Sequence, residues 1–350
     1  MFLNVMVQPV TIHANVSDGP GVPELTQEVL QSASYDRAGP DLVLKTSDGQ
    51  QIVVDGYFQS NPPPALIADN GTSLSGETVS LLAGPGPIQL AQAGGTSEPA
   101  ATVQQTGEVK TLSGTAGAQR TDGTQVELKV GTPVFQGDVV EVSQNGKLGI
   151  TFEDGAVFSL SNGATMVLDE MIYNAGGSSN KMLFTLVKGA LGLVTGEIAG
   201  SGGVEVNTPS AVLAIRGTTV ISFEIPENAQ NVPGLNGFSQ FIMCVECTNG
   251  PFEALFPNFP PINVDEDGTA VIVAAGGDQP PKVIPIPDAL RDDISSIVQN
   301  LKLTQVAELQ DLLKTASANF LTDLTDLIDL STGSGVEDIS GATFDIAALI

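Results

Sequence analysis

The pattern closest to a ligand site is an acidic run late in the sequence. In NVDEDG, residues 263–268, oxygen-bearing side chains recur at every second position and a glycine follows. Calcium loops use this alternation, and their glycine permits a sharp turn. Six residues after the glycine, where such a loop needs a bidentate glutamate, the sequence has Ala274. The run therefore predicts an acidic hairpin, with a weak calcium site at Asn263, Asp265 and Asp267 as the alternative.

The two cysteines form a second pattern with chemical potential, Cys244-Val245-Glu246-Cys247. A Cys-X-X-Cys pair can bind metal or exchange a disulfide. The preceding residues are strand-like, and residues three apart in a strand are separated by about 10 Å, beyond the roughly 7 Å limit for a disulfide. We therefore expect structural thiols. A local disulfide at a bulge or turn, and a functional redox pair, are the alternatives.

A third pattern is the single polar break in the strand-like stretch of residues 204–225. Arg216-Gly217-Thr218 interrupts it, and after the glycine apolar and polar residues alternate as in a half-buried strand. The arginine is predicted to pack its stem beside a glycine bulge and to pair with a carboxylate. A ligand anchor is the alternative.

Composition limits the functions that these patterns can serve. The chain has 40 acidic and 13 basic residues, a formal net charge of -27. This charge opposes binding to nucleic acid or to anionic lipid, where Lys and Arg supply the attraction. With His13 as the single histidine, the usual catalytic triads and zinc sites lack their parts. Adjacent Asp169 and Glu170 should point to opposite faces of a strand, so they predict no catalytic dyad. We expect a protein that is not an enzyme.

The elements that position these residues should be mainly β-strands. Asp-Gly and Asn-Gly steps recur along the chain, with short β-branched or alternating runs between them, which is typical of hairpins. The connections are too short for crossover helices. The sequence therefore predicts an antiparallel sandwich or rolled sheet. A β-solenoid is the alternative, although no fixed-period repeat is present.

The chain divides by composition into a small β-rich N-terminal module, a linker, a β domain, a segment with the pattern of amphipathic helices, and an acidic tail. Their expected boundaries are 1–90, 91–106, 107–287, 288–330 and 331–350. No apolar run is long enough to span a membrane, and the first residues lack the charged region of a secretory signal. The tail predicts either a frayed or docked end or an uncleaved export signal.

An ordered set of short motifs resembles the FecR-like domain family over roughly residues 104–285. Gly137-Asp138 and Asp154-Gly155 also have the physical character of turns, in which glycine permits positive φ and aspartate caps nearby backbone. The positions that carry the resemblance are Gly137, Asp138, Phe152, Asp154, Gly155, Asp169, Glu170, Gly189, Thr208, Pro209, Arg216, Gly217 and Thr218.

The resemblance is to the branch of this family found in secreted or surface proteins of Gram-negative bacteria, beside adhesin and type I secretion modules. It implies a non-enzymatic extracellular or cell-surface protein, with protein partners or self-assembly at the cell surface and no cofactor apart from the weak calcium site. The alternative is a signalling or regulatory module acting with a membrane partner. The regulator branch would carry a cytoplasmic segment and a membrane helix, which this sequence does not predict.

Overall fold

The computed structural model describes residues 11–15, 25–69, 72–85, 104–177, 179–201, 203–226, 228–247, 250–274 and 279–331. The chain forms two compact units, Met1–Gln305 and Val306–Ile350. Most of the predicted linker, residues 91–103, and nearly all of the predicted acidic tail, residues 332–350, lie outside the described residues.

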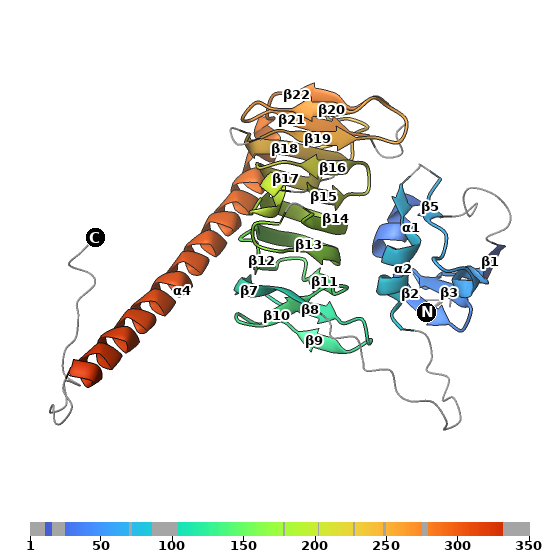
Figure 1. The fold of residues 1–350 in the computed structure, drawn as a ribbon. Coiled ribbons are helices and arrows are strands. Elements are labelled where there is room, and N and C mark those ends of the chain that lie inside the picture. The colour runs from blue at the N-terminus through green and yellow to red at the C-terminus, as the bar shows by residue number, and fades with distance from the viewer. Residues whose placement is uncertain are drawn as a thin grey trace, which may run out of the picture. The chain divides into compact units, whose positions relative to one another are not determined.

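The N-terminal part of the first unit is built on a four-stranded sheet in the order β1-β4-β3-β2 (Figure 1). The Asp48-Gly49 step, one of the recurring hairpin signals of the sequence, joins β3 to β4, and Leu42 pairs with Val54 and Leu44 with Ile52. These four side chains are fully buried, as the alternation along each strand requires. The elements are β1 (Thr11–Asn15), α1 (Gln27–Ser32), β2 (Ser34–Ala38), β3 (Asp41–Lys45), β4 (Gln51–Asp55), the 3-10 helix η2 (Tyr57–Gln59), β5 (Leu66–Ile67), β6 (Ser73–Leu74) and α2 (Gly76–Ala83).

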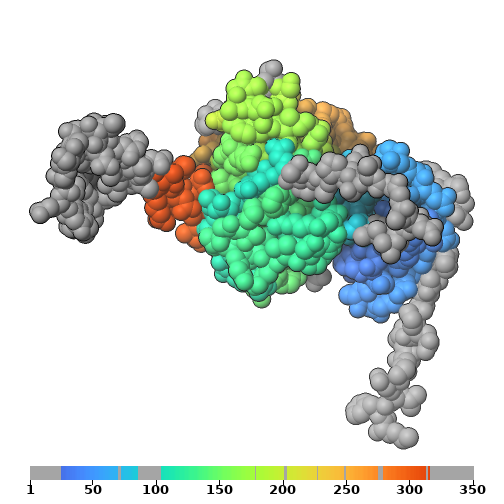
Figure 2. Space-filling view, turned by 60° about the horizontal axis from the view of Figure 1, so that its bottom comes forward, coloured from blue at the N-terminus to red at the C-terminus, as the bar shows by residue number. Residues whose placement is uncertain are grey.

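The β domain that follows is a branched 16-stranded sheet. Its strands stack along the domain in Figure 1, and the end that carries β8, β9 and β10 is the green surface nearest the viewer in Figure 2. The strands are β7 (Gln105–Ser113), β8 (Ala116–Gln119), β9 (Gln125–Glu127), β10 (Pro133–Phe135), β11 (Val139–Val142), β12 (Lys147–Phe152), β13 (Val157–Ile172), β14 (Lys181–Val194), β15 (Gly203–Asn207), β16 (Val212–Ile215), β17 (Thr219–Glu224), β18 (Gln240–Glu246), β19 (Phe252–Leu255), β20 (Ile262–Val264), β21 (Ala270–Val273) and β22 (Lys282–Ile284). The short helix α3 (Ile198–Ser201) lies between β14 and β15.

The sheet branches because β14 is long enough to pair with different strands at its two ends. Its first half pairs in parallel with β15, whereas its second half pairs antiparallel with β17. Between the halves, the pairing of β14 with β13 shifts register. Gly189 lies at this shift with φ of 89°, and a Cβ there would come within 2.4 Å of the Ala164 Cα. Glycine is therefore required where the sheet rolls.

The main core contains three phenylalanines from consecutive long strands. Phe152, Phe158 and Phe184 pack edge-on or tilted, with ring centroids 4.7 to 5.1 Å apart. The predicted motif residue Phe152 is thus a core residue. The prediction of a mainly β, antiparallel rolled architecture is confirmed. Among the described strands, only β1–β4 and β14–β15 pair in parallel, so the stacked parallel strands of a solenoid are not its architecture.

The first turns of helix α4 (Arg291–Ser331) pack on one face of β12, β13 and β14. Ile297 and Leu301 are buried there, directly over Gly192, where a Cβ would come within 2.8 Å of both side chains. The Asn300 amide donates to the Ser159 hydroxyl at 2.7 Å. The absence of a side chain at Gly192 thus lets the helix approach the sheet closely.

The sequence predicted several amphipathic helices over residues 288–330, but the structure has a short 3-10 turn, η4 (Asp288–Leu290), followed by one continuous helix of 41 residues. Neither proline nor glycine occurs between Arg291 and Ser331, so nothing in the sequence ends the helix early. Among the described residues, no helix combines the length and the apolar character needed to cross a membrane.

Candidate functional site

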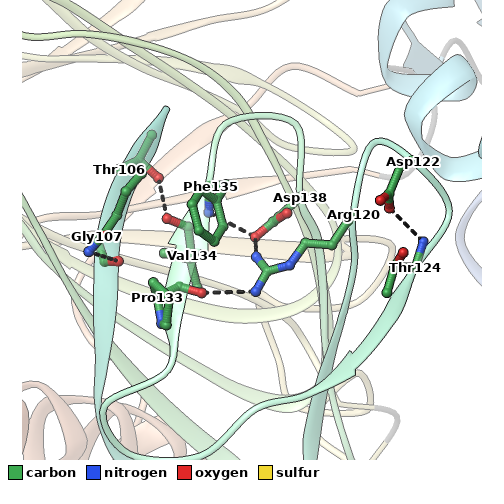
Figure 3. Close-up of polar contacts among 10 residues, drawn as sticks. Thr106, Gly107, Arg120, Asp122, Thr124, Pro133, Val134, Phe135 and Asp138 are labelled. Atoms are coloured by element: carbon green, nitrogen blue, oxygen red, sulfur yellow. Dashed lines mark hydrogen bonds and ion pairs between the residues drawn. The ribbon is translucent and has the colours of Figure 1, made fainter. Parts of the chain in front are cut away.

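A buried ion pair occupies the corner where β8, β10 and β11 meet (Figure 3). Arg120, just after β8, pairs with Asp138, which lies before β11, and also donates to the Pro133 carbonyl at 3.0 Å. The same carboxylate accepts the backbone N–H of Phe135 at 2.8 Å. The guanidinium stacks over the Phe135 ring, 4.6 Å from its centroid. This arrangement ties three strands together through one arginine.

The pKa of Asp138 is raised in spite of the neighbouring arginine. Burial raises the pKa of Asp138 to about 6, while the Phe135 N–H and Arg120 act in the opposite direction. Its Oδ1 atom is buried and has no hydrogen-bond partner among the described residues. The preceding Gly137 has φ of 83° and donates its N–H to the Leu168 carbonyl at 2.7 Å. The turn predicted at Gly137-Asp138 is present.

Asp154 and Gly155 form the second predicted turn, between β12 and β13. The Asp154 carboxylate accepts the backbone N–H of Ala156 at 3.0 Å and that of Ile198 at 3.3 Å. Gly155 has φ of 82°, which suits glycine. Burial raises the pKa of Asp154, and the two N–H donors act against that shift. Both carboxylate oxygens are used to fix backbone.

Asp169 and Glu170 point in different directions, as the strand alternation predicted. Asp169 accepts a hydrogen bond from the Thr78 hydroxyl at 3.3 Å, and burial raises the pKa of Asp169 to about 6. Glu170 pairs with Lys181 of β14 at 2.9 Å and is partly exposed. The two carboxylates therefore do not meet at one reacting atom.

The prediction that Arg216 pairs with a carboxylate is wrong. Its side chain is exposed and makes no ion pair with the described residues. The backbone explains this outcome. Gly217, with φ of 96°, turns the chain at the end of β16, while the Arg216 carbonyl lies against Gly250 of the facing loop, where a Cβ would come within 1.8 Å. The corner is fixed through main chain, and the guanidinium is directed into solvent.

Thr218, the last residue of this corner, contacts the two cysteines. Its hydroxyl donates to the Glu246 carbonyl and lies 3.1 Å from the Cys244 Sγ. Cys244 and Cys247 are joined in a disulfide with their Cα atoms 6.0 Å apart. The expectation of structural thiols is therefore corrected. The 10 Å spacing applies to a continuous strand, but β18 ends at Glu246, and the chain turns back at Cys247.

The acidic run has a partner in the same corner. The Asp267 carboxylate accepts the backbone N–H of Cys247 at 2.6 Å. Asn263 in β20 and Asp265 just after it are exposed. Across the described residues, the structure gathers no three His, Cys, Asp or Glu side chains in a metal-binding arrangement. The prediction of an acidic hairpin is wrong, because residues 265–269 connect β20, which pairs with β19, to β21, which pairs with β18. This connection brings Asp267 to the same disulfide as Thr218, and weak calcium binding stays a prediction.

Thr208 and Pro209 form the turn between β15 and β16, and this turn borders a cleft of about 250 Å³. The Thr208 hydroxyl donates to the Ala211 carbonyl at 2.7 Å and accepts the Ala211 N–H at 3.1 Å. Threonine thus closes the turn on itself. The proline, which lacks an N–H, stands two residues after the end of β15, where no ladder hydrogen bond is needed.

Two residues in these sites were not predicted from the sequence. The role of Arg120 could have been predicted from the small number of arginines. The chain has four, Arg37, Arg120, Arg216 and Arg291, and a buried aspartate needs a cationic partner. Ser210, whose buried hydroxyl has no partner among the described residues, lines the cleft beside Pro209. A single serine after a Thr-Pro step carries no signal by itself.

No known protein family and no curated protein matches this sequence. Among solved structures, two crystal structures of a putative anti-sigma factor from Parabacteroides distasonis are similar to it. One is 15% identical with a TM-score of 0.33, and the other is 16% identical with a TM-score of 0.32. Each match covers 44% of this chain and 62% of the other chain. A likeness at this level supports no argument about function.

Proposed function

We propose that this chain is a non-enzymatic binding protein that works outside the cytoplasm, at the cell surface or in the medium. The observation that carries the proposal is the Cys244–Cys247 disulfide, which is packed against Thr218 in a buried corner. Such bonds persist in oxidising compartments and are rare in the reducing cytosol. The excess of 27 negative charges suits a soluble exported protein.

The buried carboxylates support binding rather than catalysis. Asp138 is paired with Arg120, and both oxygens of Asp154 accept backbone N–H groups. Asp169 accepts from Thr78 at 3.3 Å, away from Glu170. Each carboxylate therefore stabilises its own turn or strand. General acid-base catalysis instead needs a titratable side chain that is within hydrogen-bond reach of a substrate proton.

Fractionation combined with thiol labelling tests this proposal. We expect the full chain in the medium or envelope fraction of the producing cell, with both cysteines resistant to a maleimide until a reductant is added under denaturing conditions. A variant with Cys244→Ser and Cys247→Ser provides the unlabelled control. Recovery only from cytosol, with thiols that react without reductant, would overturn the proposal.

The second candidate function is a signalling or regulatory module that acts with a membrane partner. Apolar side chains on α4 favour it, because Val306, Leu309 and Leu312 are 52 to 57% exposed. Large apolar side chains repeated along one exposed helix are typical of a surface that contacts another protein.

Deleting the gene and measuring transcription of neighbouring genes tests the regulatory function. Complementation with the wild-type chain should restore the profile, and complementation with Val306→Asp and Leu309→Asp should fail to do so. Exposed Gln305→Asp and Gln310→Asp form a matched control that adds the same charges. An unchanged profile after deletion would count against regulation.

A further inference from the structure

The cleft beside the Thr208-Pro209 turn has the dimensions of a site for one small chemical unit. Its volume is about 250 Å³, just below the roughly 300 Å³ at which sites for drug-sized ligands begin. One wall is the β15–β16 turn with Pro209 and Ser210, and another is the β19–β20 turn with Phe256 and Phe259. All these residues belong to the first compact unit.

The cleft is uncharged although the chain is strongly acidic. Among the described residues that line it, none is Asp, Glu, Lys, Arg or His, whereas the chain has 40 acidic residues. A charged ligand would lose its hydration here and find no counter-charge. The lining therefore selects for a neutral ligand.

The polar groups of the cleft are hydroxyls and amides, which both donate and accept hydrogen bonds. Thr185, Asn207 and Ser210 come from β14, from the end of β15 and from the turn. The Ser210 hydroxyl is buried and unpartnered among the described residues, so it carries an unmet hydrogen-bonding capacity. The Asn207 amide contacts the Thr185 hydroxyl only at 3.4 Å, a long hydrogen bond that a ligand could replace.

The cleft also offers an apolar surface. Phe256 and Phe259 are half-buried, so part of each ring stays available at the cleft. A pyranose ring presents C–H groups on its faces and hydroxyls around its edge. Such a ring can lie against phenylalanine while its hydroxyls reach the serine, threonine and asparagine groups.

We propose that this cleft binds one neutral sugar unit, with Ser210 bonding a ring hydroxyl and Phe259 covering an apolar face of the ring. The proposal rests on the proposed function, because it names the ligand class of a binding protein. An aliphatic anchor from a partner protein would use the phenylalanines but leave the hydroxyl and amide groups of the cleft unpaired.

Saturation-transfer NMR of the full chain with D-glucose, D-galactose and D-mannose tests the proposal, followed by titration of the strongest binder. At least one neutral hexose should give a signal. D-glucuronate, which differs from glucose by a carboxylate, should give none. Ser210→Ala and Phe259→Ala should each weaken the affinity at least about tenfold. Ser47→Ala, a serine in an exposed turn of β3–β4, should bind as the wild type does.

Unchanged melting temperatures of the variants establish that they fold. The proposal is overturned if no neutral hexose binds, if glucuronate binds as well as glucose, or if both cleft variants bind normally. Binding of a proline-rich peptide that is lost in Phe259→Ala but retained in Ser210→Ala would overturn it in favour of a protein ligand. Fractionation remains an independent test, so an exported protein without sugar binding refutes the ligand class alone.

Discussion

At two corners of the β domain, neighbouring strands are held together by different kinds of contact. At the first, Arg120 is largely buried and pairs with Asp138, whose side chain is 1% exposed. At the second, Arg216 is exposed, and the Thr218 hydroxyl joins the strands through the Glu246 carbonyl. Both corners contain a glycine with positive φ next to the polar residue, so their local sequences look alike.

The difference between the corners shows that an arginine beside a glycine turn does not identify a buried ion pair. What decides is whether a carboxylate is already buried within reach. Asp138 is fixed by the Phe135 N–H and needs a cation. At the second corner, Asp267 is exposed to solvent while it accepts the Cys247 N–H, so its charge stays hydrated and needs no buried cation.

Arg120→Met should produce the largest loss of stability. It leaves the Asp138 charge and the Pro133 carbonyl without their cationic partner in a buried corner. Removal of one member of a buried ion pair costs about 3–5 kcal/mol. Urea unfolding at neutral pH measures the change. The double variant Arg120→Met and Asp138→Asn should recover part of the loss, because no buried charge remains. A loss below about 1 kcal/mol for Arg120→Met would remove the distinction between the corners.

Of the two corners, only the first should contribute a pH-dependent part to the unfolding free energy, and acidification should increase that contribution. The pKa of Asp138 is raised to about 6 from 3.8, so between these values the folded chain binds more protons than the unfolded chain. The stabilisation that Asp138 gains from binding this proton in the folded state is fully present below about pH 4, and it is lost as the pH rises through about 6. The contribution of this residue to the unfolding free energy should therefore fall by an amount on the order of 1–3 kcal/mol.

Unfolding free energies at about pH 5 and about pH 7.5 measure this dependence. Asp138→Asn should reduce the difference between the two values, because the amide does not titrate. Thr218→Val should leave the difference as in the wild type. Equal pH dependence in the wild type and Asp138→Asn would contradict the assignment.

Thr218→Val should produce an intermediate loss of about 1–2 kcal/mol, because the Glu246 carbonyl loses its buried donor. Valine keeps the size and the β-branched shape of threonine, so packing should change little. Thr219→Val, at the next residue, where β17 begins, is the matched control, since the Thr219 side chain makes no hydrogen bond with the described residues. Equal effects of the two substitutions would assign the loss to packing.

Much of the fold could be predicted from the sequence, because its signals are local. The Asp48-Gly49 turn and the alternation of Leu42 and Leu44 predicted the first hairpin, and the structure contains it. The branching at β14 could not be predicted in this way. The branching depends on which strands pair with each half of β14. Gly189 indicates an unusual backbone conformation, but a glycine does not show which strands lie beside it.

The candidate sites were predicted less completely, because they depend on contacts between distant residues. The turn roles of Asp138 and Asp154 followed from their glycine neighbours. The cation of Asp138 comes from 18 residues earlier, and the partner of Thr218 lies 28 residues later. The sequence favoured free thiols over a disulfide because it does not locate the end of β18 to within one residue. The strand ends at Glu246, and this one residue decides the distance between the two cysteines.

Arg216→Met should have the smallest effect, although it is the same chemical change as Arg120→Met. The Arg216 side chain is exposed and forms no ion pair with the described residues, so its loss should alter the unfolding free energy by no more than about 0.5 kcal/mol. The change makes an already acidic chain more negative, which adds only a weak, salt-screened repulsion. Urea unfolding of both variants at low and at moderate salt checks this expectation. If Arg216→Met were as destabilising as Arg120→Met, the second corner would also depend on its cation, and main-chain contacts at Gly217 and Gly250 would not suffice to hold it.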